Sequence, residues 1–284
     1  MSKGPSIISQ RPGAIGEALE QANLALLARR LDEAARLAAV VLQADPDNVA
    51  AGEIQGTALL LQDRSEDAIA PLQRAAERSG DPNIETLLGR ALSNVGRREE
   101  ALNALRQATR RQPPYPQAFL ELGDQLSAAG RFEEAAAAFT EGCALNPDAL
   151  VLRVGLAYLH LKCNDRRLAR GEFEALRAAA PERYDALIGL AWVLAADGEY
   201  AAAAELFRHA LAARPGDAVV RLELAKCLLE LGERAAGEAE LRAATGGDPG
   251  NAGPALLALT ATPHGRFFLR PSAAMAFLGL DASA

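Results

Sequence analysis

The sequence has few of the residues that carry out chemistry. It contains only three cysteines and three histidines, and no Cys-x-x-Cys pair. We therefore expect small buried thiols, with neither a disulfide framework nor a zinc site. The sequence also lacks the His-Glu-x-x-His, Gly-x-Ser-x-Gly, P-loop and Gly-x-Gly-x-x-Gly motifs. We expect no catalytic residue, no metal and no cofactor, and a protein that is not an enzyme.

Lysine and long apolar runs are scarce as well. The only lysines are Lys3, Lys162 and Lys226, and the net charge is −7 with both signs interspersed. A phosphate-binding groove needs clustered basic residues, so we expect no nucleic-acid partner. No run approaches the roughly 20 apolar residues of a membrane-spanning helix, and residues 1–13 lack the apolar stretch of a signal peptide. These features predict a cytoplasmic protein without membrane insertion. The excess of arginine and alanine is typical of a GC-rich bacterium.

Aromatic residues make up only 5% of the chain, whereas 50% of it is hydrophobic, mainly alanine and leucine. β-Sheets favour aromatic and β-branched residues, whereas small side chains and leucine suit closely packed helices. This composition predicts an all-α fold.

The sequence also repeats itself every 34 residues. A proline recurs at this spacing, a glycine or its substitute precedes it, and a large hydrophobic residue lies between the two. The prolines are Pro113, Pro147, Pro181, Pro215 and Pro249; the glycine positions are Gly96, Gly130, Asn164, Gly198 and Gly232; the large residues are Leu105, Phe139, Phe173, Phe207 and Leu241. Such a period indicates a solenoid, in which each unit buries its apolar face against its neighbours.

The clearest unit runs from Pro116 to Ala149, and its pattern resembles the tetratricopeptide repeat. The residues at signature places are Phe119, Leu122, Gly123, Leu126, Ala135, Phe139 and Pro147. The resemblance implies an α-solenoid of helix hairpins, coiled as a right-handed superhelix. We expect seven units, at 15–48, 49–81, 82–115, 116–149, 150–183, 184–217 and 218–251, between a flexible arm at 1–14 and a capping segment at 252–284.

Several signature residues have a physical role in this interpretation. Gly123 and Ala135 are small because two helices cross closely there, and a larger side chain would overpack the crossing. Gly130 allows the left-handed backbone that ends a helix. Phe139 fills the space between its own helix pair and the next, and Asp217 lies where it can cap a helix start.

The resemblance also implies a ligand-facing, concave wall built from the first helix of each unit. Tyr158 and Trp192 occupy equivalent places on it, and each follows a glycine, Gly155 or Gly189, one helical turn earlier. The missing side chains predict a hollow beside each ring, and exposed aromatic rings beside hollows are typical binding hot spots. The alternative is that Trp192 only packs between units, or that the C-terminal tail covers it. The predicted peptide-binding set is Tyr158, Trp192, Gly155, Gly189, Val151, Val154, Ile188, Arg90, Asp124, Lys162 and Lys226.

One known type of ligand does not fit this wall. Members of the family that bind chaperone tails hold a terminal carboxylate in a Lys/Asn/Asn/Lys/Arg clamp. Here only Asn23 matches that clamp, and the later basic residues are absent. We therefore do not expect the chain to bind the C-terminal tails of chaperones.

The C-terminal stretch is unusually apolar for a tail. A short helix is expected from Gly253-Pro254 onward, as a cap on the last unit. Disordered tails are poor in aromatics, so we expect the apolar residues that follow to dock on something. They could form a second capping piece, or a hook for a partner or for a second copy of the chain; disorder is the remaining alternative. The expected docking residues are Phe267, Phe268, Leu269, Met275, Phe277 and Leu278.

Three functions are compatible with these features. The first is a non-catalytic scaffold or adaptor that binds a peptide or protein segment on the concave wall. The second is a regulatory or substrate-recruiting subunit of an enzyme complex. The third is a structural solenoid that self-associates through its tail.

Overall fold

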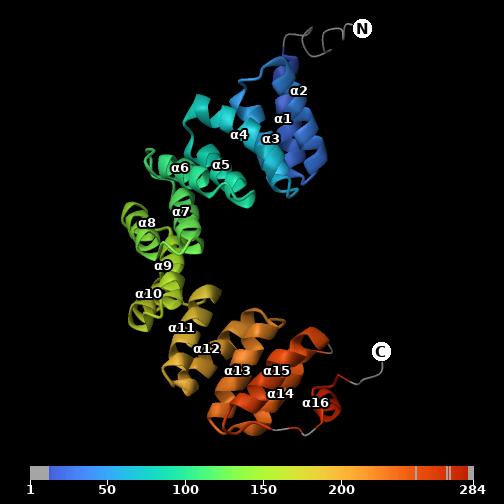
Figure 1. The fold of residues 1–284 in the computed structure, drawn as a ribbon, viewed down its shortest axis with the longest axis vertical. Helices are drawn as coiled ribbons and strands as arrows, with labels where there is room; N and C mark the ends of the chain where they lie inside the picture. The colour runs from blue at the N-terminus through green and yellow to red at the C-terminus, as the bar shows by residue number, and fades with distance from the viewer. Residues whose placement is uncertain (1–12, 247, 267, 269, 281–284) are drawn as a thin grey trace. The chain divides into compact units, whose positions relative to one another are not determined.

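The computed structural model describes residues 13–246, 248–266, 268 and 270–280, and their regular structure is helical (Figure 1). The predicted all-α solenoid is thereby confirmed. Most of the predicted N-terminal arm, together with Phe267 and Leu269 of the tail, lies outside the described residues. Within the described part of the chain, no helix has the length and apolar character needed to cross a membrane.

The chain forms two compact parts, Met1–Gly155 and Leu156–Ala284. The helices of the first part are α1 (Ala14–Leu27), α2 (Leu31–Ala44), α3 (Val49–Leu60), α4 (Ser65–Ser79), α5 (Pro82–Asn94), α6 (Arg98–Thr109), α7 (Pro116–Ala128) and α8 (Phe132–Leu145). Helix α9 (Leu150–Lys162) begins in the first part and ends in the second. The second part continues with α10 (Arg166–Ala179), α11 (Tyr184–Ala196), α12 (Tyr200–Ala213), α13 (Ala218–Glu230), α14 (Arg234–Thr245), α15 (Ala252–Ala261) and α16 (Pro271–Phe277).

Consecutive helices pack as antiparallel pairs, and the first helix of one pair also contacts the first helix of the next. Helices α1, α3, α5 and α7 make such contacts in sequence, as do α13 and α15. Each pair starts close to a boundary expected from the 34-residue period, and we propose that each pair is one repeat unit. The right-handed sense of the superhelix stays a prediction.

Local sequence signals place the ends of these helices. The side chains of Asn48, Asp81 and Asp217 accept hydrogen bonds from backbone amides in the first turns of α3, α5 and α13, which confirms the predicted cap at Asp217. Gly130 ends α7 in the predicted left-handed conformation, with a φ of 76°. Asn164 adopts the same conformation at the end of α9, with a φ of 58°.

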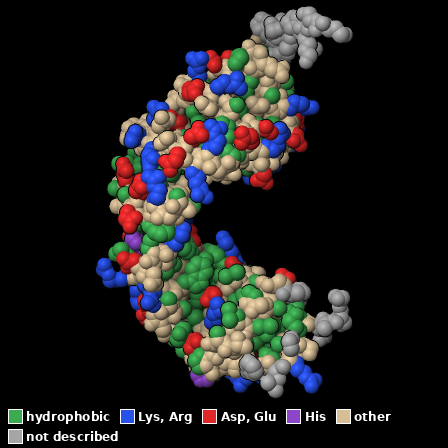
Figure 2. Space-filling view, in the orientation of Figure 1, with side chains coloured by type: hydrophobic (Ala, Val, Ile, Leu, Met, Phe, Trp, Pro, Cys, Tyr) green, Lys and Arg blue, Asp and Glu red, His purple; other side chains and the backbone are tan. Residues whose placement is uncertain are grey.

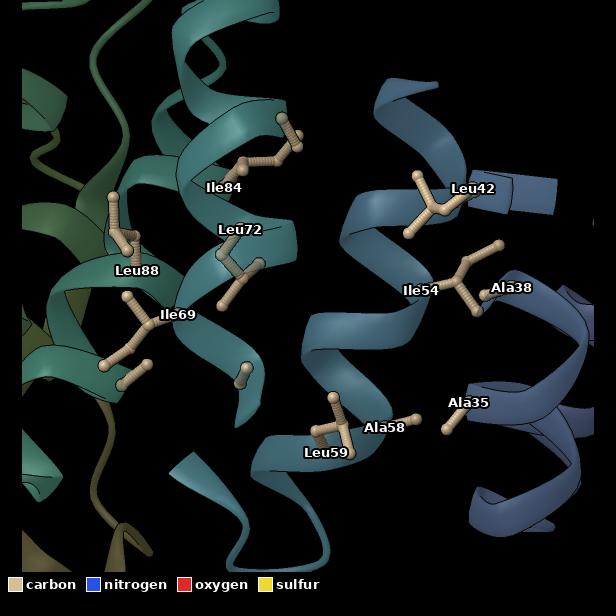
Figure 3. Packing of buried hydrophobic residues seen from close by; sticks show 14 of the residues in the cluster. Ala35, Ala38, Leu42, Ile54, Ala58, Leu59, Ile69, Leu72, Ile84 and Leu88 are labelled. Carbon is tan, nitrogen blue, oxygen red and sulfur yellow. The ribbon is translucent and has the colours of Figure 1, made fainter. Parts of the chain in front are cut away.

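The core of the first part consists of small and aliphatic side chains. Figure 3 shows Ile54 of α3 directed at Ala38 and Leu42 of α2. On the other side of α3, Leu72 of α4 is fully buried. Alanines in this cluster let the helix axes approach, while the leucines and isoleucines fill the remaining space.

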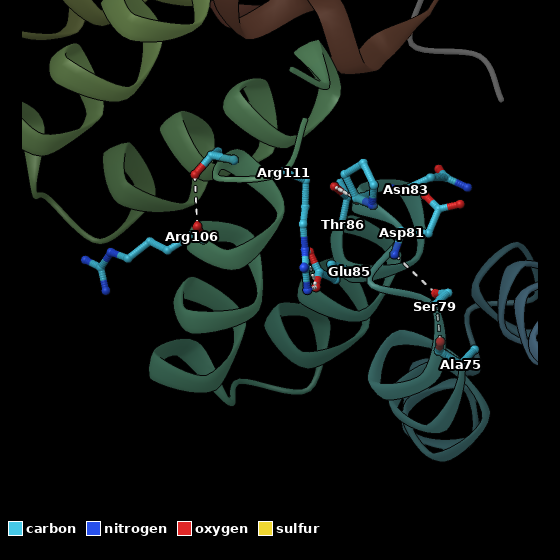
Figure 4. Close-up of polar contacts among 10 residues, drawn as sticks. Ala75, Ser79, Asp81, Asn83, Glu85, Thr86, Arg106 and Arg111 are labelled. Carbon is cyan, nitrogen blue, oxygen red and sulfur yellow. Dashed lines mark hydrogen bonds and ion pairs between the residues drawn. The ribbon is translucent and has the colours of Figure 1, made fainter. Parts of the chain in front are cut away.

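One buried ion pair reinforces the packing of α5. The Glu85 side chain is only 4% exposed, and Arg111, just beyond the end of α6, binds it with a shortest N–O distance of 2.6 Å. Figure 4 shows the arginine extended alongside α5 to reach this carboxylate. Removing one partner would leave a poorly solvated charge, so the pair fixes α6 against α5.

Large side chains of second helices lie directly against glycines of first helices. A Cβ added to Gly123 would lie 2.5 Å from the ring of Phe139, and one added to Gly189 would lie 2.2 Å from the ring of Phe173. Both distances are far below van der Waals contact. Because glycine has no side chain, the phenylalanine ring of the second helix can occupy this space.

We expect Gly189→Ala to lower the free energy of unfolding by roughly 1–3 kcal/mol, because the new methyl group overpacks against Phe173. Gly171→Ala on α10 is the matched control, since nothing lies within 4 Å of its added Cβ. Alanine should there raise stability by up to about 1 kcal/mol through its helix propensity. Urea unfolding followed by far-UV circular dichroism measures both, and equal stabilities of the two variants would contradict this role of Gly189.

Candidate functional site

The second part carries a largely apolar groove of about 500 Å³ on the side formed by its first helices. We call the exposed side of the first helices the first-helix face of each part, formed by α11, α13 and α15 in the second part and by α1, α3, α5 and α7 in the first. We call this pocket the Trp192 groove. Figure 2 shows hydrophobic side chains gathered over this region of the second part. The groove is lined mainly by Trp192 and Ala195 of α11, Cys227 and Glu230 of α13, and Leu257 and Ala261 of α15.

A row of aromatic rings holds Trp192 in place. The Tyr158 ring meets the buried Phe173 ring edge-on, with 5.2 Å between centroids, and meets the Trp192 ring edge-on at 6.2 Å. The Tyr158 hydroxyl donates a hydrogen bond to the backbone oxygen of Asp185, at 3.3 Å. Burial raises the pKa of Tyr158 to about 12, so the hydroxyl stays a neutral donor. The indole is thus half-buried and fixed before any ligand arrives.

The hollows that the sequence suggested beside Tyr158 and Trp192 do not exist, and this expectation is wrong. A Cβ on Gly155 would lie 2.5 Å from the Phe139 ring, and one on Gly189 would lie 2.2 Å from the Phe173 ring. Both glycines serve core packing at these points. The groove lies instead on the other side of Trp192, toward α13 and α15.

The thiol on the groove floor is not suited to chemistry. Cys227 is buried, and burial, with Glu223 as the next cause, raises its pKa to about 12. The thiol therefore stays protonated at neutral pH, and the thiolate is the nucleophilic form. The expectation of buried cysteines holds for Cys227 and is wrong for Cys163, which is exposed.

Charged groups of the groove lie at its rim. Lys226, predicted from the sequence, lines the groove and forms an ion pair with Glu223, at 2.7 Å. Glu230 lines it too, and among the residues that the structure describes no basic side chain forms an ion pair with it. Ile188 is half-buried on α11, and Lys162 is exposed at the end of α9; neither lines the groove.

The other predicted site residues belong to the first part, whose first-helix face is polar. Arg90 of α5 forms an ion pair with Glu121 of α7 at 3.4 Å, and Gln125 donates to the same carboxylate at 3.2 Å. Val151 is exposed and Val154 half-buried, both on α9.

Asp124 of α7 is an unusual carboxylate on this polar face. Its side chain reaches solvent. Nevertheless, desolvation by surrounding protein atoms, followed by repulsion from Glu121, raises its pKa to about 6. No described basic side chain forms an ion pair with it. The folded protein therefore disfavours the charged form of Asp124, and ionisation of this carboxylate lowers its stability.

A smaller pocket of about 440 Å³ lies on the same polar face, among α1, α3 and α5. Glu53 lines it and accepts a hydrogen bond from Asn83 at 2.7 Å; the Tyr115 hydroxyl in turn donates to Asn83 at 3.0 Å. Burial and the nearby charge of Asp81 raise the pKa of Glu53 despite this hydrogen bond. The two parts therefore present first-helix faces of different character.

The described residues of the tail pack on their own chain. Leu278 and Leu280 are buried with residues of α13, α14 and α15, and Phe268, Met275 and Phe277 pack against this cluster. Thr245 donates a hydrogen bond to the backbone oxygen of Leu278 at 2.9 Å. Phe267 and Leu269, also predicted to dock, lie outside the described residues.

A buried carboxylate ties the tail down further. The carboxylate of Glu238 on α14 forms ion pairs with Arg234 and Arg266, each at an N–O distance of 3.0 Å. The Arg266 guanidinium also lies 4.8 Å from the centre of the Phe277 ring. Desolvation acts to raise the pKa of Glu238, but the hydrogen bonds from the two arginines outweigh it and lower the value.

The sequence reasoning missed one wall of the groove. Leu257 of α15 is 64% exposed and lines it. The sequence predicts only a capping role for the segment from residue 252 onward. A signal was nevertheless available, because a further 34-residue step from Glu223 arrives at Leu257, so the ligand-facing series continues onto α15.

Comparison with known proteins agrees with this architecture. One tetratricopeptide repeat model matches residues 19–82, 86–149 and 154–218, and a second matches residues 194–261. Among curated proteins, the chain is 34% identical over 67 residues to the small glutamine-rich tetratricopeptide repeat-containing protein 2 of Mycosarcoma maydis. This match covers 24% of the chain and only 19% of that protein.

Solved structures show the same fold. A tetratricopeptide repeat protein from Parabacteroides merdae has a TM-score of 0.65 at 17% identity, covering 86% of this chain and 98% of that one. PilW, a widely conserved type IV pilus biogenesis factor, has a TM-score of 0.62 at 18% identity, covering 72% and 96%. At such identities the likeness shows the fold alone.

We expect Asp124→Asn to stabilise the protein at pH 7.5 and to have little effect at pH 4. The folded pKa lies above the ordinary value of 3.8, so the folded state binds its proton more tightly and gains stability as the pH falls through about 6. A fully buried group would give roughly 3 kcal/mol; solvent screening reduces the expected gain to about 1 kcal/mol. Thermal unfolding at both pH values measures it. Glu20→Gln, at an exposed position on α1, is the control, and a pH-independent effect of Asp124→Asn would contradict the assignment.

We expect Glu238→Gln to loosen the tail. Losing the charge-assisted bonds to Arg234 and Arg266 should speed hydrogen exchange at the amides of Leu278 and Leu280 by about tenfold. Because the pKa of Glu238 is lowered, its stabilising contribution is present above about pH 4.5 and is lost in stronger acid. Glu205→Gln, at an exposed site on α12, should leave this exchange unchanged. Tail exchange equal to wild type in Glu238→Gln would show that the arginines do not hold the tail.

Proposed function

Because the chain belongs to the tetratricopeptide repeat family, we propose that it is a non-catalytic scaffold that binds a segment of another protein on its first-helix faces. The observation that carries this proposal is the Trp192 groove. Its position corresponds to the face that the family resemblance assigns to ligands.

The composition of the groove supports binding of a protein segment. Tryptophan is among the residues most enriched at binding hot spots, and here the ring is held by Tyr158 on one side and open to the groove on the other. Leu257 exposes most of its surface opposite it. A rigid aromatic side chain that loses little entropy on binding is an efficient contact.

The chemistry of the face supports a non-catalytic role. The groove thiol is kept protonated by burial, and its lysine is paired with a carboxylate at 2.7 Å. A partner that is itself an enzyme would make the chain a recruiting subunit, and a second copy would make it a self-associating solenoid.

The test is capture of a partner by the immobilised full chain from an extract of the source organism, followed by titration of the identified partner. We expect Trp192→Ala to weaken binding by about 30-fold or more, as for a hot-spot residue. Leu168→Ala on α10, an exposed apolar residue outside the groove, is the matched control and should leave affinity unchanged. Circular dichroism shows whether both variants fold. Equal affinity of wild type and a folded Trp192→Ala would refute the groove as the binding site.

A further inference from the structure

The floor of the Trp192 groove accepts an apolar side chain. Ala195, Ala258 and Ala261 leave space between the larger Trp192 and Leu257. The volume of about 500 Å³ lies within the roughly 300–1,000 Å³ range of ligand-binding pockets. Because the walls offer little hydrogen bonding, the group that fills this space gains most by being aliphatic or aromatic.

The rim adds an unbalanced negative charge. Lys226 and Glu223 neutralise each other across 2.7 Å. Glu230, on the same helix and one turn further along, has no ion-pair partner among the described residues, and so the charged side chains lining the groove sum to one negative charge. Burial is the main cause of the raised pKa of the Cys227 thiol; Glu223 and Glu230 add to it, and Lys226 opposes them.

Helix ends strengthen this preference for a cation. Ala196, Glu230 and Ala261 are the last residues of α11, α13 and α15, and all three line the groove. The C-terminal end of a helix carries partial negative charge. At α11 a cation already occupies such a place, because Arg166 donates to the backbone oxygen of Ala196 at 2.6 Å. At α13 the His264 ring contacts the backbone oxygen of Leu229 at 3.0 Å and leaves the Glu230 carboxylate unpaired.

We infer that the groove binds a peptide segment carrying one bulky apolar side chain close to a lysine or arginine. The apolar side chain lies between Trp192 and Leu257, and the basic group pairs with Glu230. This inference rests on the proposed scaffold function and specifies the chemistry of its partner. An acidic segment would place its charge close to the Glu230 carboxylate, and would therefore bind more weakly.

The sequence supplies a direct probe, since Trp192 is its only tryptophan. Blocked twelve-residue peptides in a Gly/Ser background, free of tryptophan and tyrosine, are titrated into the full chain. Four versions carry Leu with Lys, Leu with Glu, Ser with Lys, or Ser with Glu, each pair separated by one to four residues. We expect the Leu/Lys peptides to move the Trp192 emission to shorter wavelength with saturation, because the indole loses water. Leu/Glu should bind up to about fivefold more weakly, and Ser/Lys about tenfold or more weakly.

Substitutions at two positions, each with a matched control, assign the two halves of the site. Glu230→Gln should abolish the preference for Lys over Glu, and Glu230→Lys should reverse it, whereas Glu141→Gln at an exposed position on α8 should change nothing. Leu257→Ser should weaken Leu/Lys binding by about tenfold. Val219→Ser, at a site 58% exposed on α13 and outside the groove, should not.

Several outcomes overturn the inference. One is that no peptide shifts the Trp192 emission; another is that Leu/Glu binds as well as Leu/Lys to the wild type. A change of emission with protein concentration alone, accompanied by a dimer in sedimentation that Leu257→Ser abolishes, would identify a second copy as the occupant. Partner capture that is lost in Trp192→Ala but unaffected by Glu230→Lys overturns this inference alone, whereas capture unaffected by Trp192→Ala overturns the proposed function itself.

Discussion

The other features of the structure depend on one packing contact. In it, a large side chain of a second helix packs directly against a glycine of a first helix. In the first part, the Phe139 ring fills the space where a Cβ of Gly123 or of Gly155 would be, each 2.5 Å from ring atoms. In the second part, Phe173 lies against Gly189 in the same way. A packed interior tolerates no such overlap, so these three positions require glycine as long as the phenylalanine rings keep their places.

This packing also determines which surface of the protein can bind a partner. The second helices direct their large side chains inward, so the first helices keep one side free for solvent or a partner. On the first part that side holds carboxylates, two of which, Glu53 and Asp124, are desolvated enough for their pKa values to rise. On the second part it holds Trp192 and Leu257. One packing rule thus supports two surfaces of different chemistry, because the free side is not constrained by the core.

The same distinction explains what could be predicted from the sequence. Period and helix-end signals depend on local chemistry, and Gly130 and Asp217 have the roles that were expected of them. The hollows beside Gly155 and Gly189 could not be judged that way, because a missing side chain looks the same in sequence whether the space is empty or filled by a distant phenylalanine. Nor does the period reveal that Arg90 pairs with Glu121, since this contact depends on side-chain conformation across two units.

Helix α15 contributes both to the C-terminal core and to the wall of the Trp192 groove. Its Ala255 and Leu259 are buried with Leu278 and Leu280 of the tail, and its Leu257 and Ala261 face the groove. A ten-residue helix is marginal alone and takes most of its stability from packing. Helix α15 packs on α13 and α14, and the tail, held by Glu238 and its two arginines, covers a further part of it, so these contacts together support the groove wall. The tail's apolar side chains thus contribute to the Trp192 groove without touching a ligand, by keeping Leu257 opposite Trp192.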